Sequence, residues 1–332
     1  MDRRILFALS LIAVSTEIVI GLSIDKFWSV KLQGTEGIKF SADGYLGVAG
    51  TDGCAYVFDI QGNLRQKVCR TEGMSDVSSF KNIFAFSCYD GYVYVIDPEK
   101  GLVGAHFVGF GSSDAITLLS DGYIACKWDC VYYKLGEIRW KLPLHWVENG
   151  PAVYMKTVYI PERDLKELLI VSLGNGEIRY RIRFRSPVWH ATVCSGNLAV
   201  ATSNSVYIFE IFDLTKPREI LAINASKPFR VSFSPDCNYI AIADASRYLK
   251  VYDLKGNLTL SIELSNNATS VDWWSRYIAV ALADGTVEVY VIHVPLFKSL
   301  SEYFLPILVL PLLLAISGII LYKRKKDSYL KF

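Results

Sequence analysis

The segment VSFSPDCNYIAIADASRYLKVYDLKGNLTLSI, residues 231–262, decides the fold of this protein. Apolar and polar side chains alternate in its YIAIA and YLKVY runs, a pattern typical of β-strands with two unlike faces. The polar segment KGN at residues 255–257 separates YLKVY from a further short strand, and Gly-Asn between alternating runs is a hairpin signal. The segment therefore predicts four short antiparallel strands, which we call a to d, joined by tight turns.

The same plan recurs along the chain. Clear copies occupy residues 38–68 and 77–107, and weaker copies start near Ala115, Ala152, Val188 and Thr269. The turn between strands b and c carries Asp-Gly in three copies, at Asp52-Gly53, Asp90-Gly91 and Asp284-Gly285. The period of about 40 residues is that of propeller blades, which are four-stranded antiparallel sheets. The sequence therefore predicts an all-β fold, a seven-bladed β-propeller over residues 25–293.

An N-terminal strand is predicted to close the ring. The seventh copy, residues 270–292, has no strand d, whereas the orphan strand KFWSVKL at residues 26–32 precedes the first copy and resembles the strand d sequence EIRWKL at 137–142. We expect the orphan strand to complete blade seven, because closure removes the unpaired edges of an open sheet. The chain then enters and leaves on one face. The opposite face, which we call the top face, carries the d–a loops between blades and the b–c turns.

Two kinds of motif resemble WD-repeat propellers. The turns FSADG (40–44) and FSPDC (233–237) are similar to the F-S-P-D-G turn of that family. Phe58-Asp59, Ile96-Asp97 and Tyr252-Asp253 stand where the family carries Trp-Asp. The resemblance covers roughly residues 27–292 and lacks the family's Gly-His pair and a true Trp-Asp. Quinoprotein-like propellers share much of the same pattern. By analogy with such folds, function is expected in the loops.

The two ends of the chain indicate a membrane-anchored protein. Residues 1–23 read as a signal peptide or N-terminal membrane segment, because a basic start precedes a short apolar run and small residues. Residues 304–322 (FLPILVLPLLLAISGIILY) carry no charge and predict a transmembrane helix. Residues 323–332 begin with KRKK and predict a short basic cytoplasmic tail under the positive-inside rule. We expect one C-terminal helix in the lipid bilayer of the cell membrane and an extracytoplasmic propeller.

External exposure would make three sequons available, and Asn224, Asn257 and Asn267 are therefore glycosylation candidates. The alternative topology is a cytosolic propeller scaffold with a C-terminal membrane anchor. Reduced thiols and unmodified sequons would favour it.

Seven cysteines are expected to lie where oxidation is permitted. With Gln61-Gly62 as a two-residue turn, counting outward places Cys54 opposite Cys69, so these two are disulfide candidates. Closure of Cys126 with Cys130 over a three-residue loop requires a different strand register, whereas Cys194 and Cys237 occupy equivalent a–b turns of neighbouring blades. The odd count leaves at least one thiol outside an intramolecular pair.

No catalytic motif is present. The sequence contains no G-x-S-x-G, H-E-x-x-H or P-loop, and no cysteine or histidine spacing predicts a metal site. We expect no enzyme activity and no cofactor. The alternative is a propeller enzyme of quinoprotein-like or sugar-processing type, although the seven Trp residues follow no regular phase.

The predicted top-face loops carry the binding candidates. His145, Trp146 and Glu148 lie in one of these loops, where an exposed Trp anchors a protein or stacks on a sugar, or instead packs between blades. The other loops carry Glu36, Glu72, Asp76 and Asp114, which form either a ring of carboxylates that attracts a cation or basic partner, or an ordinary solvated rim. The net charge of +2 argues against nucleic acid. We therefore expect a scaffold that binds protein or glycan through its top face.

Overall fold

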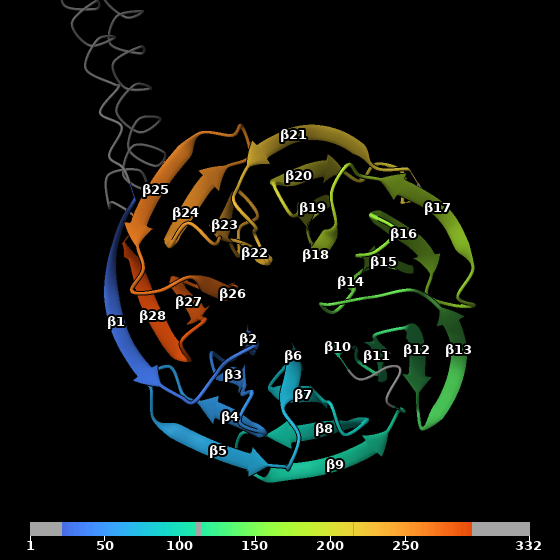
Figure 1. Ribbon diagram of the computed structural model, residues 1–332, viewed down its shortest axis with the longest axis horizontal. Coiled ribbons are helices and arrows are strands. Elements are labelled where there is room, and N and C mark those ends of the chain that lie inside the picture. The colour runs from blue at the N-terminus through green and yellow to red at the C-terminus, as the bar shows by residue number, and fades with distance from the viewer. Residues whose placement is uncertain (1–21, 110–113, 215, 294–332) are drawn as a thin grey trace, which may run out of the picture. The chain divides into compact units, whose positions relative to one another are not determined.

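The computed structural model describes residues 22–109, 114–214 and 216–293, and within these ranges every regular element is a strand. Residues 24–292 form one compact unit of seven four-stranded sheets around a central axis (Figure 1). The prediction of an all-β, seven-bladed propeller is confirmed. The predicted transmembrane helix, the basic tail and nearly all of the predicted signal segment lie outside the described residues. Within the described ranges, no helix has the length and apolar character needed to cross a membrane.

Blades 1 to 4 each use four consecutive strands, in the order a to d from the axis outward. Blade 1 contains β2 (Gly37–Phe40), β3 (Leu46–Ala49), β4 (Cys54–Phe58) and β5 (Leu64–Cys69). Blade 2 contains β6 (Met74–Phe80), β7 (Ile83–Cys88), β8 (Tyr92–Asp97) and β9 (Gly101–Phe107). Blade 3 contains β10 (Ala115–Leu118), β11 (Gly122–Cys126), β12 (Asp129–Lys134) and β13 (Glu137–Pro143). Blade 4 contains β14 (Ala152–Tyr154), β15 (Thr157–Glu162), β16 (Glu167–Ser172) and β17 (Ile178–Arg183).

Blades 5 and 6 repeat this order, and blade 7 takes its outer strand from the start of the chain. Blade 5 contains β18 (Val188–Cys194), β19 (Asn197–Thr202), β20 (Ser205–Glu210) and β21 (Arg218–Asn224). Blade 6 contains β22 (Arg230–Phe233), β23 (Tyr239–Ala243), β24 (Tyr248–Asp253) and β25 (Leu258–Glu263). Blade 7 contains β26 (Ala268–Trp274), β27 (Tyr277–Leu282), β28 (Thr286–His293) and β1 (Ser23–Lys31).

Ion pairs hold β1 against blade 7. Lys31 contacts Asp284 at 2.6 Å, and the hydrogen bond from Lys31 is the main reason that the pKa of Asp284 falls to about 2. Lys26 contacts the buried carboxylate of Glu288 at 2.5 Å. Because the end of β1 meets the turn that precedes β28, the two strands run in opposite directions. The start of β1 therefore lies toward the end of β28, as the closure argument expects.

Turn chemistry explains the repeated hairpins. In the b–c turns, the Oδ1 atoms of Asp52, Asp90 and Asp284 accept hydrogen bonds from backbone N–H groups two residues later. The glycine after each aspartate has a positive φ between 83° and 87°, a conformation that costs glycine little. Side chains of strand a then link successive blades, because Asp76 accepts from the backbone N–H of Ile116 and Asp272 from that of Phe40.

Three disulfides occur among the described residues. Cys54 and Cys69 are directly opposed in blade 1 and joined, and the turn between them differs from the expected two-residue form because a β-bulge lies between Val57 and Phe58. Cys126 and Cys130 are paired within blade 3, and Cys194 and Cys237 connect the a–b turns of blades 5 and 6. The thiol of Cys88 is free and buried.

Candidate binding site on the top face

A pocket of ≈ 200 Å³ opens at the centre of the top face. Residues from several blades line it because the d–a loops and the starts of the strands a converge on the axis (Figure 1). The lining residues are Glu36, Ser75, Tyr89, Asp114, Glu148, Asn149, Phe229, Arg230 and Thr269. Three of the predicted carboxylates, Glu36, Asp114 and Glu148, are therefore brought together in one site.

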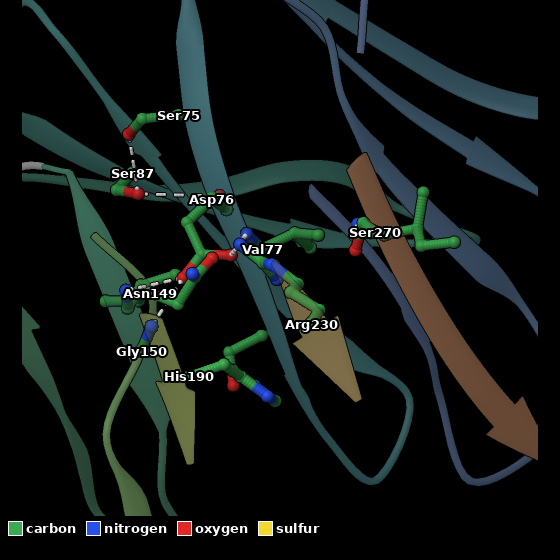
Figure 2. A network of polar contacts seen from close by, with 12 residues as sticks. Ser75, Asp76, Val77, Ser87, Asn149, Gly150, His190, Arg230 and Ser270 are labelled. Carbon is green, nitrogen blue, oxygen red and sulfur yellow. Dashed lines mark hydrogen bonds and ion pairs between the residues drawn. The ribbon is translucent and has the colours of Figure 1, made fainter. Parts of the chain in front are cut away.

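A buried ion pair lies beneath the pocket. Asp76 in β6 and Arg230 in β22 approach to 2.5 Å, and both side chains are nearly inaccessible to solvent. The second carboxylate oxygen of Asp76 accepts hydrogen bonds from the backbone N–H groups of Ile116 and Gly150 (Figure 2). We expected Asp76 in a d–a loop of the top face, but it lies within β6. The carboxylate of Asp76 is fully paired with Arg230 and with backbone N–H groups. Asp76 therefore lies beneath the site and is not part of its open surface.

His190 also faces the axis, at the start of β18 and close to Arg230 (Figure 2). Its Nδ1 accepts a hydrogen bond from the backbone N–H of Val231 at 3.4 Å. Burial, followed by the positive charges of Arg230 and Lys39, holds the pKa of His190 well below its ordinary value of 6.5. The imidazole is therefore neutral at pH 7, and the hydrogen bond joins blades 5 and 6 through it.

Glu36 is the pocket carboxylate that lacks a partner. Among the described residues, its side chain makes no hydrogen bond and no ion pair, although it is accessible to solvent. The walls of the pocket reduce its hydration, and this burial is the main cause of a raised pKa. Arg230 lowers the pKa of Glu36, whereas Glu148, Asp114 and Asp76 raise it. Its negative charge is therefore held in an environment that disfavours it.

Asp114 has an internal cation beside it. Lys127 donates to Asp114 at 3.0 Å, which opposes the effect of burial, and the pKa of Asp114 is nevertheless raised. The Nζ atom of Lys127 also lies 5.2 Å from the ring centre of Tyr89 and 5.0 Å from that of Trp128. Both distances are within the range of cation–π attraction. Lys127 thus neutralises Asp114 and contacts two exposed aromatic side chains, of which Tyr89 lines the pocket.

Glu148 is arranged in the same way. Arg163 pairs with it at 3.0 Å, and the Nε1 atom of Trp146 donates to it at 2.7 Å. The Arg163 guanidinium lies 5.3 Å from the ring centre of Trp146 and 4.5 Å from that of Trp189. Trp146 is half-buried in this cluster, so it packs internally more than it projects outward.

The remaining loop candidates have other positions. The backbone N–H groups of His145 and Trp146 donate to the fully buried carboxylate of Glu162, which fixes their loop, and the side chain of His145 is exposed. Glu72 is exposed and does not line the pocket. The three sequon residues Asn224, Asn257 and Asn267 are all exposed. The structure therefore unites part of the predicted set and leaves Glu72 and His145 outside the site.

Sequence reasoning missed Tyr89, Asn149, Phe229 and Arg230 as site residues. A signal for Arg230 was available in the repeat itself. In six of the blades, the equivalent positions of strand a hold Gly37, Asp76, Ala115, His190, Arg230 and Ser270. Asp76 is the one acid among these six residues and Arg230 the one side chain with a permanent positive charge, which predicts a pair across the ring. Nothing in the repeat distinguished Tyr89 or Phe229.

Three carboxylates and the rings of Tyr89 and Phe229 line the pocket, an arrangement that can bind a cation. Across the described part of the chain, no three His, Cys, Asp or Glu side chains are close enough to hold a metal ion together. The pocket carboxylates lie apart from one another in its wall. Two of them already form ion pairs within the protein, Asp114 with Lys127 and Glu148 with Arg163. An organic cation that reaches Glu36 and contacts the aromatic rings fits this geometry better than a bare ion.

Comparisons with known proteins support the fold. Neither the protein-family models nor the curated proteins contain a match to this sequence. Among solved structures, the Cps50 (Swd1) β-propeller domain of Myceliophteria thermophila is similar, with a TM-score of 0.70 and 14% identity over 82% of this chain and 100% of that chain. BamB from Moraxella catarrhalis is similar with a TM-score of 0.63 and 14% identity, over 81% of this chain and 97% of that chain. At this level of identity, the likeness concerns the fold.

Proposed function

We propose that this protein is a binding scaffold that holds a basic segment of a protein partner in the top-face pocket. The observation that carries the proposal is the carboxylate of Glu36, which has no hydrogen-bond or ion-pair partner among the residues that the structure describes. The other three acids of the site each have a cation, since Asp76 pairs with Arg230, Asp114 with Lys127, and Glu148 with Arg163. The site is therefore left with one uncompensated negative charge, which a Lys or Arg side chain of a partner would neutralise.

Two exposed aromatic residues, Tyr89 and Trp128, support the proposal that the site binds a basic segment. Tyr89, which lines the pocket, is 41% exposed, and Trp128, which contacts the same Lys127, is 51% exposed, although large aromatic side chains are usually covered. Aromatic residues carry much of the binding energy at protein interfaces, and they also attract cations through their ring faces. Lys127 holds these two rings in place before any partner arrives, which reduces the entropy lost on binding.

We further propose that the propeller acts outside the cytoplasm, attached to the lipid bilayer by the segment 304–322. The apolar segments at both ends and the KRKK cluster after residue 322 support this topology. Pairing of six of the seven cysteines also suits an oxidising compartment. A membrane-impermeant thiol reagent and an external protease, applied to intact cells, test it. Protection of the propeller from the protease until lysis would exclude the proposal.

The lining of the pocket supports a binding role. Its described residues are carboxylates, aromatic rings and other polar side chains, and none of them is a Cys or His. Proposed binding therefore rests on electrostatics and ring contacts in the top face, as is usual for function placed in the loops of a scaffold.

Titration with hexalysine tests the pocket directly. The full-length protein in detergent micelles is titrated by calorimetry with hexalysine and, as the uncharged reference, with fully N-acetylated hexalysine. Glu36→Gln is expected to weaken hexalysine binding about fivefold or more, because one charge contact is lost. Glu72→Gln is the matched control, since Glu72 is exposed and outside the pocket. Equal losses in the two variants, or binding of the acetylated peptide, would contradict the proposal.

A further inference from the structure

A second pocket lies between blades 2 and 3, away from the top-face site. It measures ≈ 450 Å³, and its lining comes from both blades. Blade 2 contributes Val95 and His106, and blade 3 contributes Leu118, Tyr123 and Tyr133. A pocket of this size with a mainly apolar lining and a few polar groups has the character of a small-molecule site.

The buried cluster between blades 2 and 3 borders the pocket, because Tyr123 belongs to both. The cluster consists of Ala85, Val93, Ile116, Tyr123 and Ala125, and it is the smallest of the buried clusters found among the described residues. Ala125 occupies a strand b position that faces the preceding blade. The equivalent residues of the other blades are larger: Val48, Phe86, Ile160, Val200, Ile242 and Val280.

Tyr123 also departs from the repeat. Its equivalents in strand b of the other blades are all apolar and fully buried: Leu46, Phe84, Val158, Leu198, Ile240 and Ile278. Tyr123 is 4% exposed, and its buried hydroxyl has no hydrogen-bond partner among the described residues. Buried polar groups are nearly always paired, so this hydroxyl requires a partner that the described chain does not supply.

The chemistry around Tyr123 limits what that partner is. Its ring stacks with those of His106 and Tyr133, at 5.9 Å and 5.4 Å between ring centres, each pair within 16° of parallel. Flat rings therefore already fill one side of the pocket and suit a further flat ring. The carboxylate in the lining, Asp121, is neutralised by Lys134 at 2.7 Å. The site therefore offers no uncompensated carboxylate to attract a cation and complements an uncharged molecule.

We propose that the pocket between blades 2 and 3 binds a small, uncharged aromatic molecule that accepts a hydrogen bond from the Tyr123 hydroxyl. The ligand ring lies against the stacked rings. Because the hydroxyl is closed to solvent, side chains beside it shift to let the acceptor atom of the ligand reach it. This site is separate from the top-face pocket and does not depend on the function proposed for that pocket.

The probe for the test is 4-fluoroacetophenone, a flat neutral ring with one carbonyl acceptor, observed by fluorine NMR with the full-length protein. Its reference is 4-fluoro-α-methylstyrene, which has the same shape with a CH₂ group in place of the carbonyl oxygen. For a probe of this size we expect a dissociation constant of about 1 mM. Tyr123→Phe is expected to weaken acetophenone binding roughly five- to tenfold, as for loss of one hydrogen bond, and to leave the styrene unchanged.

Phe84 stands at the equivalent position of blade 2, so Tyr123→Phe places a residue that this fold already accommodates there. Leu118→Trp, which fills the pocket, is expected to abolish binding of both probes. The proposal is overturned if neither probe binds, if Leu118→Trp has no effect, or if Tyr123→Phe weakens both probes equally. It is also overturned if an ordered water on Tyr123 persists when the probe is present, because the hydroxyl would then be paired without a ligand.

Discussion

Asp76 and Arg230 are 154 positions apart in the sequence and form a buried ion pair that joins blades 2 and 6 across the axis of the ring. The pair is a direct contact across the axis between blades that are not neighbours. Arg230 lines the top-face pocket, and Asp76 pairs with it there (Figure 2). A partner that enters this pocket meets a charged but internally satisfied surface at its base.

Loss of the Arg230 charge is expected to destabilise the propeller. Arg230→Met leaves the carboxylate of Asp76 buried without its cation, which typically costs about 3 kcal/mol in free energy of unfolding. Arg218→Met is the control, because Arg218 forms an exposed pair with Glu210 whose loss costs less than about 1 kcal/mol. Guanidinium unfolding of each variant under non-reducing conditions measures both values. Equal costs would show that the central pair is not the stronger contact.

Glu36→Gln is expected to stabilise the fold at pH 7. The pKa of Glu36 is raised on folding, so the folded state binds the proton more tightly than the unfolded state, and ionisation of Glu36 at neutral pH opposes folding. The stability gained by Glu36→Gln is therefore present at pH 7. It disappears as the pH falls below 4.5, the ordinary pKa of a glutamate, where Glu36 is protonated in both the folded and the unfolded state. Thermal unfolding at pH 7 and pH 4 tests the sign. A loss of stability at pH 7 would refute it.

His190 predicts a pH dependence of the opposite sign. Its pKa is depressed on folding, so the unfolded state binds the extra proton as the pH falls below 6.5, and stability is lost in that direction. The slope is at most about 1.4 kcal/mol per pH unit for one group. His190→Gln should flatten the unfolding free energy between pH 6.5 and pH 5. If the slope of the variant equals that of the parent in urea unfolding series, another group is responsible.

The three disulfides should differ in their contribution to stability. The sequence separations are 43 residues for Cys194–Cys237, 15 for Cys54–Cys69 and 4 for Cys126–Cys130. Loop-closure entropy predicts stabilisation of about 4, 3 and 2 kcal/mol in that order. Paired Cys→Ser substitutions, unfolded under oxidising conditions, give the three values. A larger cost for the Cys126–Cys130 pair than for Cys194–Cys237 would contradict the entropic ranking.

The repeat made the fold predictable because it depends on local signals. Asp-Gly turns and alternating strands appear in the sequence at a regular spacing, and each acts within one hairpin, as Asp52 does in blade 1. The closing strand was also predictable, because the seventh repeat lacked strand d and the strand at residues 26–32 belonged to no repeat. These features require no knowledge of which side chains meet across the ring.

The site was predicted less completely for the same reason. Loop positions placed Glu36, Asp114 and Glu148 on one face, but a repeat does not say which loop side chains turn toward the axis and which, like Glu72, remain outside. Asp76 was assigned to a loop because the strand beginning at Met74 starts earlier than the apolar pattern suggested. Pairing of Asp76 with Arg230 depends on closure of the whole ring, which local patterns do not describe.

Closure by β1 has a consequence for the order of events during synthesis. The first strand of the propeller to leave the ribosome is the last to find its partner, because Lys26 must wait for Glu288, 262 positions later. Until β28 is made, β1 has no strand of blade 7 to pair with. A ribosome that stalls before residue 286 would thus release a chain with two unpaired edges, a ready substrate for chaperones or for association with another unfinished copy.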